Sequence, residues 1–189
     1  MKRLWFLLFP LMTFSQDNYI LFSAGLDTGN AIGAGVTDNT AQLNYVVQFA
    51  MVASNIEVNL GAEIFPVLDF KRYSLGAGYH FPLYAYIKRN EIKTTFIPTL
   101  EPSLIDRHDT WGGGLSGDNK SSQMTLALNL ALQWDLNDNL SIQYAANFLP
   151  RTDLKSKYPE KMWNEDIKVA NTPVSISNFI KLVYRIERY

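Results

Sequence analysis

The side chains best able to do chemistry are two histidines, His80 and His108, and the charged residues around them. His108 lies within Asp106–Asp109 (DRHD), where two carboxylates and an imidazole suggest a metal site. A serine close to a histidine would instead suggest acyl transfer. The residue two positions after His108 is Thr110, however, and the chain contains no His-x-Ser motif. We therefore interpret the DRHD run as a solvated loop and expect no catalytic residue, no metal and no cofactor.

A glycine-rich run, Trp111–Gly117 (WGGGLSG), looks at first like a phosphate-binding loop. Such a loop needs a lysine directly after its last glycine and a strand before it and a helix after it. Lys120 stands too far along the chain, and no strand-loop-helix context surrounds it. The run is therefore interpreted as a surface loop.

Composition narrows the classes of protein further. The 189 residues include no cysteine, which excludes disulfides and thiolate metal sites. Aromatic residues make up 13% of the chain and charged residues 19%, the opposite of a disordered sequence. The net charge of −1 gives no indication of nucleic-acid binding.

The first residues have the pattern of a secretory signal peptide. A basic start, Met1–Arg3, precedes a short apolar run, Leu4–Met12, and Thr13–Ser15 places small residues at a cleavage site before Gln16. We expect a signal peptide over residues 1–15 and one mature domain over 16–189. Apolar signal segments that end just before glutamine are similar to those of the Bacteroidota, which suggests a Gram-negative source.

The strands that would position any site are predicted by an alternation of apolar and polar residues with a period of two. Met124–Trp134 (MTLALNLALQW) places its leucines on one face and all its polar residues on the other, which favours a strand over a helix. The same alternation recurs along the mature chain. The expected strands are Tyr19–Leu26, Gln42–Met51, Ile56–Ile64, Arg72–Ala85, Ile92–Leu104, Met124–Leu136, Leu140–Phe148 and Ile176–Glu187.

The connections alternate between short and long. Ala53–Asn55, Arg89–Asn90 and Asn137–Asn139 are predicted tight turns, rich in residues that tolerate positive φ. The longer links are Asp27–Thr40, Pro66–Lys71, Asp106–Lys120 and Arg151–Pro173. This arrangement predicts an all-β fold, an eight-stranded antiparallel up-and-down β-barrel. Bulges or strand ends are expected at Pro82, Pro98 and Pro102, because proline cannot donate to the sheet.

Alternation alone does not say which face meets water. A soluble lipocalin-like carrier would turn its apolar face inward, and no apolar run is long enough for a transmembrane helix. The strands are nevertheless long, and the polar face is rich in small uncharged residues. The apolar face is too bulky to fit inside a barrel of eight strands. These features favour a transmembrane barrel, in contact with membrane lipid.

The mature chain resembles the small eight-stranded outer-membrane barrels of the outer-membrane protein A and X families. The resemblance rests on the strand pattern over the whole mature chain and not on a diagnostic motif. The last residue, Tyr189, is aromatic as in such barrels, but the apolar set Leu182, Tyr184 and Ile186 is one position out of phase with it. The resemblance implies a location in the cell outer membrane, in contact with lipopolysaccharide, and a structural, adhesive or accessory-subunit role carried by extracellular loops. Some barrels of this size trim or transfer lipid A acyl chains and need a histidine with a serine at the outer rim, so His108 keeps a lipid A hydrolase or transferase as the alternative.

Charged residues on the polar face are expected in the lumen, where they must be paired. Glu63 and Arg72 flank one short loop on adjacent strands and form the best single pair. A salt-bridged plug is favoured over a conducting path, because an eight-stranded lumen is normally filled. The expected network comprises Glu57, Glu63, Arg72, Lys93, Glu101, Lys181, Arg185 and Glu187.

The last long link, Arg151–Pro173, is the candidate surface for a protein partner. It carries Tyr158, Met162 and Trp163 among many charges. Long loops on rigid barrels often carry function, and exposed aromatic residues are typical interface anchors. A self-packed or disordered loop is the alternative interpretation.

Overall fold

The computed structural model describes residues 18–32, 43–66, 70–87, 90–109, 119–150 and 174–187. The expected signal peptide, the glycine-rich run and the loop with Tyr158, Met162 and Trp163 lie outside these residues. The strands are β1 (Tyr19–Asp27), β2 (Tyr45–Ala53), β3 (Ile56–Phe65), β4 (Phe70–Tyr79), β5 (Phe81–Ile87), β6 (Asn90–Asp109), β7 (Asn119–Asp135), β8 (Leu140–Pro150) and β9 (Val174–Glu187).

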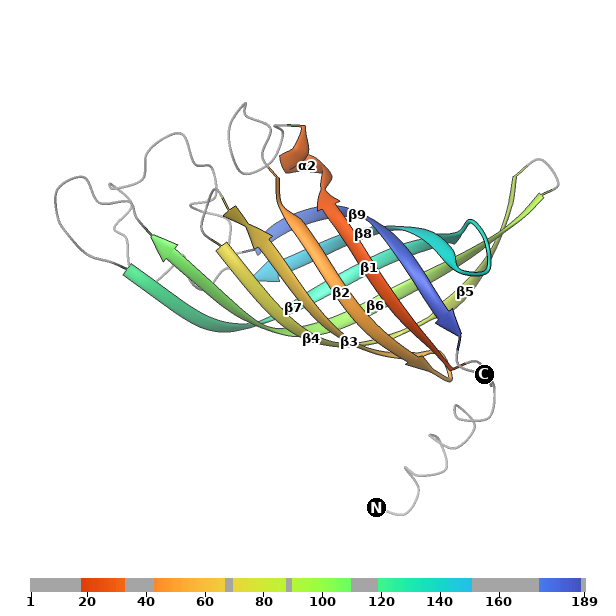
Figure 1. Ribbon diagram of the computed structural model, residues 1–189, viewed down its shortest axis with the longest axis horizontal. Coiled ribbons are helices and arrows are strands. Elements are labelled where there is room, and N and C mark those ends of the chain that lie inside the picture. Colours follow the sequence, from red (N-terminus) through yellow and green to blue (C-terminus); the bar gives the residue numbers. More distant parts are fainter. Residues whose placement is uncertain are drawn as a thin grey trace, which may run out of the picture.

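The strands form a closed antiparallel barrel, which confirms the predicted fold (Figure 1). The sheet runs in the order β4-β3-β2-β1-β9-β8-β7-β6-β5, and a direct pairing of β4 with β6 closes it. β4 and β5 pair with the same side of β6 in one register, from Phe70 opposite Arg107 to Ile87 opposite Asn90. They are therefore one long strand of the wall, interrupted at His80, and the barrel has eight strands as predicted.

The two ends of the barrel differ in their connections. At one end, here called the turn end, short connections join β2 to β3, β5 to β6 and β7 to β8. Ser54 and Asn55 form a two-residue hairpin turn with φ of 52° and 65°, the positive values that such turns require. In the β7–β8 turn the Asn137 side chain accepts hydrogen bonds from the backbone N–H groups of Asn139 and Leu140, at 3.0 and 2.8 Å.

The long connections lie at the opposite end, here called the loop end (Figure 1). One of them begins with α2 (Thr28–Ala31), a single helical turn that the Asp27 carboxylate caps by accepting from the Asn30 N–H at 3.0 Å. Among the described residues, no helix has the length and apolar character needed to cross a bilayer. The expected loop Asp106–Lys120 is shorter in the structure, because β6 continues to Asp109 and β7 starts at Asn119. The DRHD run is therefore strand, and its interpretation as a loop is wrong.

The prolines of β6 interrupt the pairing between strands locally, but they do not shift the register. Pairing of β4 and β5 with β6 is missing opposite Pro98 and Pro102, yet the register is unchanged on either side. β6 stays paired with β7 through both prolines. A residue in an antiparallel strand directs its N–H toward one neighbour only, so proline costs a bond on one side alone. No bulge occurs at these prolines in the described strands, but strand ends do, as the alternative expectation had it: β4 ends at Tyr79, opposite Pro98, and β5 begins at Phe81, next to Pro82.

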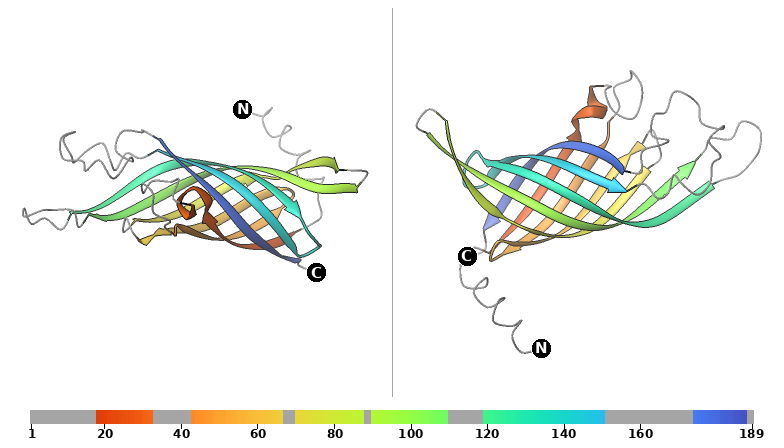
Figure 2. Two further views of the ribbon diagram at one scale, coloured as in Figure 1. Left: turned by 90° about the horizontal axis from the view of Figure 1, so that it is seen from above. Right: turned by 180° about the vertical axis from the view of Figure 1, so that it is seen from behind.

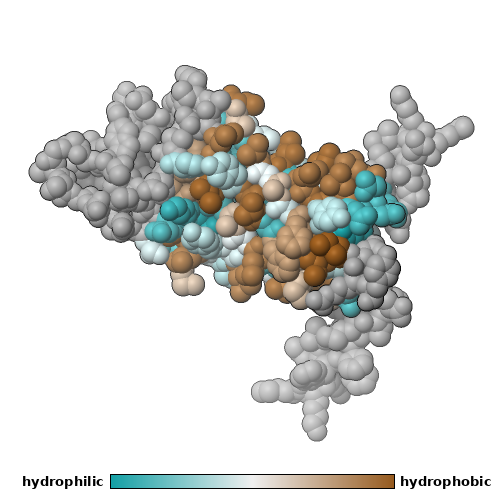
Figure 3. Space-filling model, in the orientation of Figure 1, coloured by the Kyte–Doolittle hydropathy of each residue, from teal (hydrophilic) through white to brown (hydrophobic). Residues whose placement is uncertain are grey.

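The two faces of the wall divide as the alternation predicts. Large apolar residues such as Leu60, Leu126 and Leu182 are exposed on the outside, while Asn59, Ala127 and Lys181 are buried inside. Hydrophobic residues cover much of the described surface on the face shown in Figure 3. The interior is less uniformly polar than expected. Three apolar clusters occupy it: Leu21, Ala50, Val52 and Val183 toward the turn end; Val46, Ile97, Ala131, Ala145 and Phe179; and Phe65, Phe70, Ile105, Ala127 and Leu149 toward the loop end.

The hairpin of β5 and the first part of β6 extends beyond the rest of the wall at the turn end. At the turn end, β3 begins at Ile56, which lies opposite Tyr79 of β4. The last residue pair between β6 and β7 at this end joins Thr94 to Trp134. The pairs from Tyr84–Lys93 to Ile87–Asn90 therefore lie past both neighbouring strands (Figure 2). This extension explains why Lys93, which was expected in the lumen, is exposed instead.

Gly25 on β1 lets β9 approach closely enough to place Lys181 inside the barrel. A Cβ at Gly25 would lie 2.7 Å from Lys181 Cγ and against the Ile180 carbonyl oxygen. Gly25→Ala is expected to lower the free energy of unfolding by about 1–3 kcal/mol, the usual cost of overpacking. Urea titration of the detergent-solubilised barrel measures this. Ser23→Ala, which removes an atom from the same face of β1, is the control, and equal stability of the two variants would contradict the close approach.

Candidate functional site

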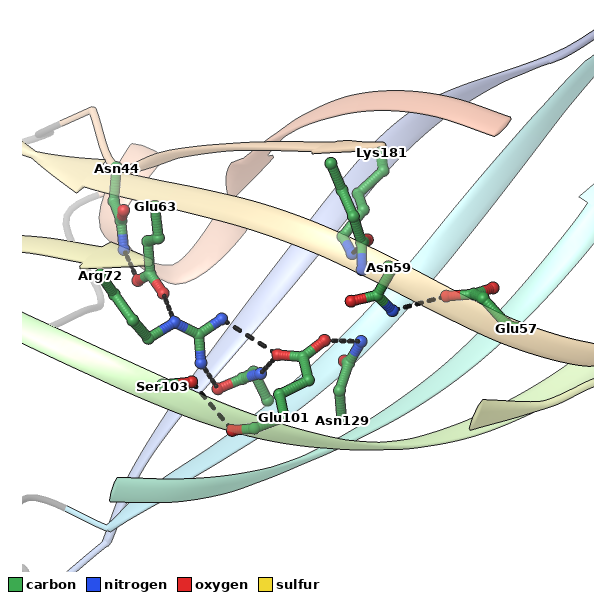
Figure 4. A network of polar contacts seen from close by, with 11 residues as sticks. Asn44, Glu57, Asn59, Glu63, Arg72, Glu101, Ser103, Asn129 and Lys181 are labelled. Atoms are coloured by element: carbon green, nitrogen blue, oxygen red, sulfur yellow. Dashed lines mark hydrogen bonds and ion pairs between the residues drawn. The ribbon is translucent and has the colours of Figure 1, made fainter. Parts of the chain in front are cut away.

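The described polar residues of the lumen gather into two groups, which we call the central cluster and the turn-end cluster. The central cluster comprises Asn44, Glu63, Arg72, Glu101, Ser103, Asn129 and Asn147 (Figure 4). These residues come from strands on opposite sides of the barrel, or directly precede one, and all are buried. Each takes its inward position from the alternation of its strand.

Arg72 is the centre of this cluster. The sheet register places it directly opposite Glu63, with Nε 3.0 Å from Glu63 Oε2. Its Nη2 lies 3.3 Å from Glu101 Oε2, so one guanidinium joins two carboxylates. All three side chains are at most 4% exposed. The planar, permanently charged guanidinium suits such a bridge better than lysine would.

Asparagine amides complete the central cluster. Arg72 Nη1 donates to Asn147 Oδ1 at 2.8 Å, and Asn147 Nδ2 donates to Glu101 Oε2 at 3.2 Å. Asn129 Nδ2 donates to the other oxygen of Glu101 at 3.3 Å, and Asn44 Nδ2 donates to Glu63 Oε1 at 3.0 Å. The buried carboxylates thus receive both charge and hydrogen bonds, as burial of charge requires.

Lys181 lies beside the central cluster and leaves little free space. Its Nζ donates to Gln48 Oε1 at 2.9 Å. The gap among Lys181, Arg72, Glu101 and Asn129 has a volume of about 10 Å³. That is about the smallest space that holds one water molecule. Side chains therefore fill this part of the lumen.

The turn-end cluster centres on His80, at the break between β4 and β5. His80 Nε2 lies 2.7 Å from Glu57 Oε2, and the Tyr19 hydroxyl lies 3.2 Å from His80 Nδ1. Asn59 Nδ2 donates to the other Glu57 oxygen at 2.6 Å. The backbone N–H of His80, freed by the break, donates to the Asn55 carbonyl at 2.8 Å. This accounts for every polar group of the imidazole and its backbone donor.

A second part of the turn-end cluster links β7, β8 and β9. Arg185 stacks over the Tyr19 ring at 4.6 Å, and its Nη2 lies 3.6 Å from Asp135 Oδ2. Asp135 Oδ1 accepts from Ser141 at 2.8 Å and from Gln133 at 3.2 Å. Arg185 is about 21% exposed, so this pair borders the barrel mouth and is not part of the buried lumen.

Tyr19→Phe tests the contact between Tyr19 and His80. The substitution keeps the aromatic ring beneath Arg185 and removes only the hydroxyl, so we expect a loss of about 0.5–1.5 kcal/mol in unfolding free energy. Urea titrations of Tyr19→Phe, His80→Ala and the double variant form the appropriate cycle. In the His80→Ala background the tyrosine change should cost almost nothing. Additive costs would show that Tyr19 and His80 do not interact.

The structure brings five of the eight expected lumen charges into buried positions. Glu57, Glu63, Arg72, Glu101 and Lys181 are buried, and Glu63 meets Arg72 as expected. Lys93 is exposed, and Arg185 sits at the mouth. The Glu187 backbone pairs with Tyr19, and its side chain lies outside the described part. His108 pairs with Lys120 through the backbone, and its side chain also lies outside the described part.

The alternation places the amides of both clusters on the inward face, but the expected network of charges did not include them. They are Asn44, Gln48, Asn59, Asn129, Gln133 and Asn147. Each sits on the predicted inward face, in phase with a buried charge on its own or a neighbouring strand. Their position on the same alternating face as the buried charges is the one signal in the sequence that points to them.

The arrangement favours a structural network over a binding cavity. Ligand sites for small molecules are usually about 300–1,000 Å³. The lumen gap of about 10 Å³ is far smaller, and polar side chains line it. A lipocalin-like carrier is therefore contradicted by the described lumen. In the same part of the chain, no three histidine, aspartate or glutamate residues cluster as metal ligands.

Comparison with known proteins gives a fold and no family. No family model matches the sequence, and no curated protein matches it. The structure is similar to the N-terminal β-barrel domain of OprF from Pseudomonas aeruginosa, with a TM-score of 0.53 and 11% identity over 90% of this chain and 98% of that one. It also aligns with Neisserial surface protein A, with a TM-score of 0.47 and 12% identity over 92% of this chain and 98% of that one. Ail of Yersinia pestis aligns with a TM-score of 0.41 and 15% identity over 90% of this chain and 97% of that one. At this identity the OprF similarity shows the fold alone, that of a small eight-stranded barrel.

Proposed function

We propose that this chain is an outer-membrane β-barrel protein of a Gram-negative bacterium, akin to the outer-membrane protein A and X families. The observation that carries the proposal is the inverted distribution of polarity. Large apolar side chains cover the outside of the wall, while ionised groups are buried at its centre. Soluble proteins rarely expose apolar patches of more than a few hundred Å². A wall of this kind is stable when its surroundings are hydrocarbon.

Within that proposal, the rigid barrel serves as a support for its loops. The filled lumen leaves no described path or pocket along the axis, so activity is assigned to the loop end. The role is structural, adhesive or that of an accessory subunit, and the chain is not an enzyme. The loop that carries Tyr158, Met162 and Trp163 is the proposed contact with a protein partner. Lipopolysaccharide and other membrane lipids surround the wall.

Fractionation of a Gram-negative host tests the location. The mature chain, with Gln16 as its first residue by N-terminal sequencing, is expected in the outer-membrane fraction. Its gel mobility should change on boiling, because a closed barrel resists detergent until heated. Recovery of the chain in the soluble periplasmic fraction would overturn the proposal.

Cross-linking on intact cells tests the role of the loop. A partner cross-linked to the wild-type chain should be lost in the Tyr158→Ala/Trp163→Ala variant, whose boiling-dependent mobility should be unchanged. Thr152→Ala, in the same link but without an aromatic change, serves as the matched control. A partner retained by the aromatic variant would place the contact elsewhere.

A further inference from the structure

The outer wall is not evenly covered by large side chains. A hollow of about 640 Å³ opens on the outward face of β9, β1, β2 and β3, and we call it the outer hollow. Its floor is the row Ala24, Val47 and Ala62, an exposed valine with one alanine on either side, which the sheet register places directly side by side. Each of these side chains points outward in the alternation of its strand.

Large side chains bound this floor. In the next row toward the turn end, Phe22, Phe49 and Leu60 are paired across the same three strands and line the outer hollow. The rings of Phe22 and Phe49 meet edge to face, with centroids 5.0 Å apart, which fixes this side as a firm aromatic border. On the β9 side, Leu182 and Tyr184 complete the lining.

A corresponding row of large residues lies toward the loop end. Leu26, Tyr45 and Ile64 are paired with one another there, two residues beyond the floor on each strand. The floor is therefore one residue row wide between two bulky rows. Such a space fits a single chain of methylene groups. A second barrel, whose own wall is bulky, would rest on the rows and leave the floor unfilled.

The floor of the outer hollow lies in the loop-end half of the wall, and its aromatic border lies near the middle. Ala24 comes three residues before the loop-end terminus of β1 at Asp27 but five after the turn-end terminus at Tyr19. The positions of Val47 in β2 and Ala62 in β3 are biased the same way. In an outer membrane with extracellular loops, this half of the wall faces the outer leaflet, where the lipid is lipopolysaccharide.

We propose that the outer hollow binds an acyl chain of lipid A, the lipid part of lipopolysaccharide. The proposal rests on the proposed outer-membrane location. Outside the hollow, lipid chains contact a convex wall and exchange freely. Inside it, a chain lies on the floor, with the Phe22–Phe49 pair along one side and Leu182 at the β9 end of the floor row. Dispersion contacts on several sides of one chain favour it over the neighbouring lipids.

The test counts lipid A chains that stay with the full-length protein after gentle extraction from the outer membrane. The probe is the 3-hydroxy fatty acid of lipid A, measured per barrel by gas chromatography and mass spectrometry. The Ala24→Leu/Ala62→Leu variant fills the floor and should retain several-fold less than the wild type. Ala77→Leu/Ala146→Leu, at outward alanines that do not line the hollow, should retain as much as the wild type.

Each other outcome overturns the proposal. Equal retention by the filled variant and the wild type would show that the hollow binds no lipid A chain. Loss of fatty acids without the 3-hydroxy group would point to phospholipid instead, and loss of a dimer on native gels would point to a second copy of this chain. Boiling-dependent mobility shows that each variant is folded. Failure of the wild type itself to reach the outer membrane would refute the proposed function, a result distinct from failure of the hollow.

Discussion

Arg72→Ala is expected to lower the free energy of unfolding by about 3–5 kcal/mol, because it leaves buried carboxylates without their cation. Arg72 lies 3.0 Å from Glu63 and 3.3 Å from Glu101, and both carboxylates are at most 4% exposed. Neither of them has solvent to replace the guanidinium. The measurement is a urea titration of the barrel in detergent micelles, followed by tryptophan fluorescence and by boiling-dependent gel mobility.

Two further variants show whether the cause is the charge. Lys71→Ala removes the neighbouring cation, which is exposed on the opposite face of β4, and should change stability by less than about 0.5 kcal/mol. Adding Glu63→Gln and Glu101→Gln to Arg72→Ala removes both unpaired charges and should restore part of the loss. Equal stability of Arg72→Ala and Lys71→Ala would mean that the ion pairs of the central cluster contribute nothing.

Leu128→Arg is expected to destabilise the membrane-inserted barrel by about 2–4 kcal/mol, the cost of a cation on the lipid face near the bilayer centre. Leu128 points outward from β7, between Leu100 on β6 and Phe148 on β8. The neighbouring residues on its strand, Ala127 and Asn129, are buried in the lumen. Reversible urea unfolding from liposomes measures the cost.

Asp138→Arg is the matched control for this prediction. Asp138 is exposed in the turn between β7 and β8, where an arginine reaches water and should cost at most about 1 kcal/mol. The difference between the two sites is what distinguishes a lipid-facing wall from a wet one. If Leu128→Arg were as harmless as Asp138→Arg, the outward face of β7 would be in water.

The strands and their faces follow from the sequence because each depends on local alternation. Leu126, Leu128 and Leu130 share a face at a period of two in any register. The two-residue turn at Ser54 and Asn55 is equally local. The pairing of Glu63 with Arg72 needed only one step more, since consecutive strands joined by a short loop become neighbours.

Contacts across the barrel interior depend on its three-dimensional closure and do not follow from local pattern. Arg72 meets Glu101 and Asn147, which are 29 and 75 residues away, only when strand tilt and stagger are set. Lys93 belongs to the alternating residues of β6 that face the lumen, yet the hairpin that carries it extends past the neighbouring strands. The alternation of side chains tells which face of the strand a residue is on. The length of the strand relative to the adjacent strands decides whether that face is covered by the rest of the barrel.

The mixed interior has a similar cause. Ile97 and Phe179 face inward although the inward face is mainly polar, and they belong to one apolar cluster with Val46 and two alanines. A lumen of fixed diameter must be filled to native density, and polar residues alone would each need a partner. Apolar layers on either side of the ion pairs fill the volume and keep water from Arg72 and its carboxylates.

The most direct test of the account is a scan of lipid contact along β7. The chain has no cysteine, so single cysteines from 124 to 134 can each carry one nitroxide label. In liposomes, labels at the even positions, among them Leu126, Leu128 and Leu130, should collide with oxygen dissolved in the bilayer and be shielded from a water-soluble nickel complex. Labels at Ala127, Asn129 and Ala131 should be shielded from both. Oxygen accessibility that alternates in this way, high at the even positions and low at the odd ones, supports a membrane wall around a packed lumen. Nickel access at the even positions would contradict it.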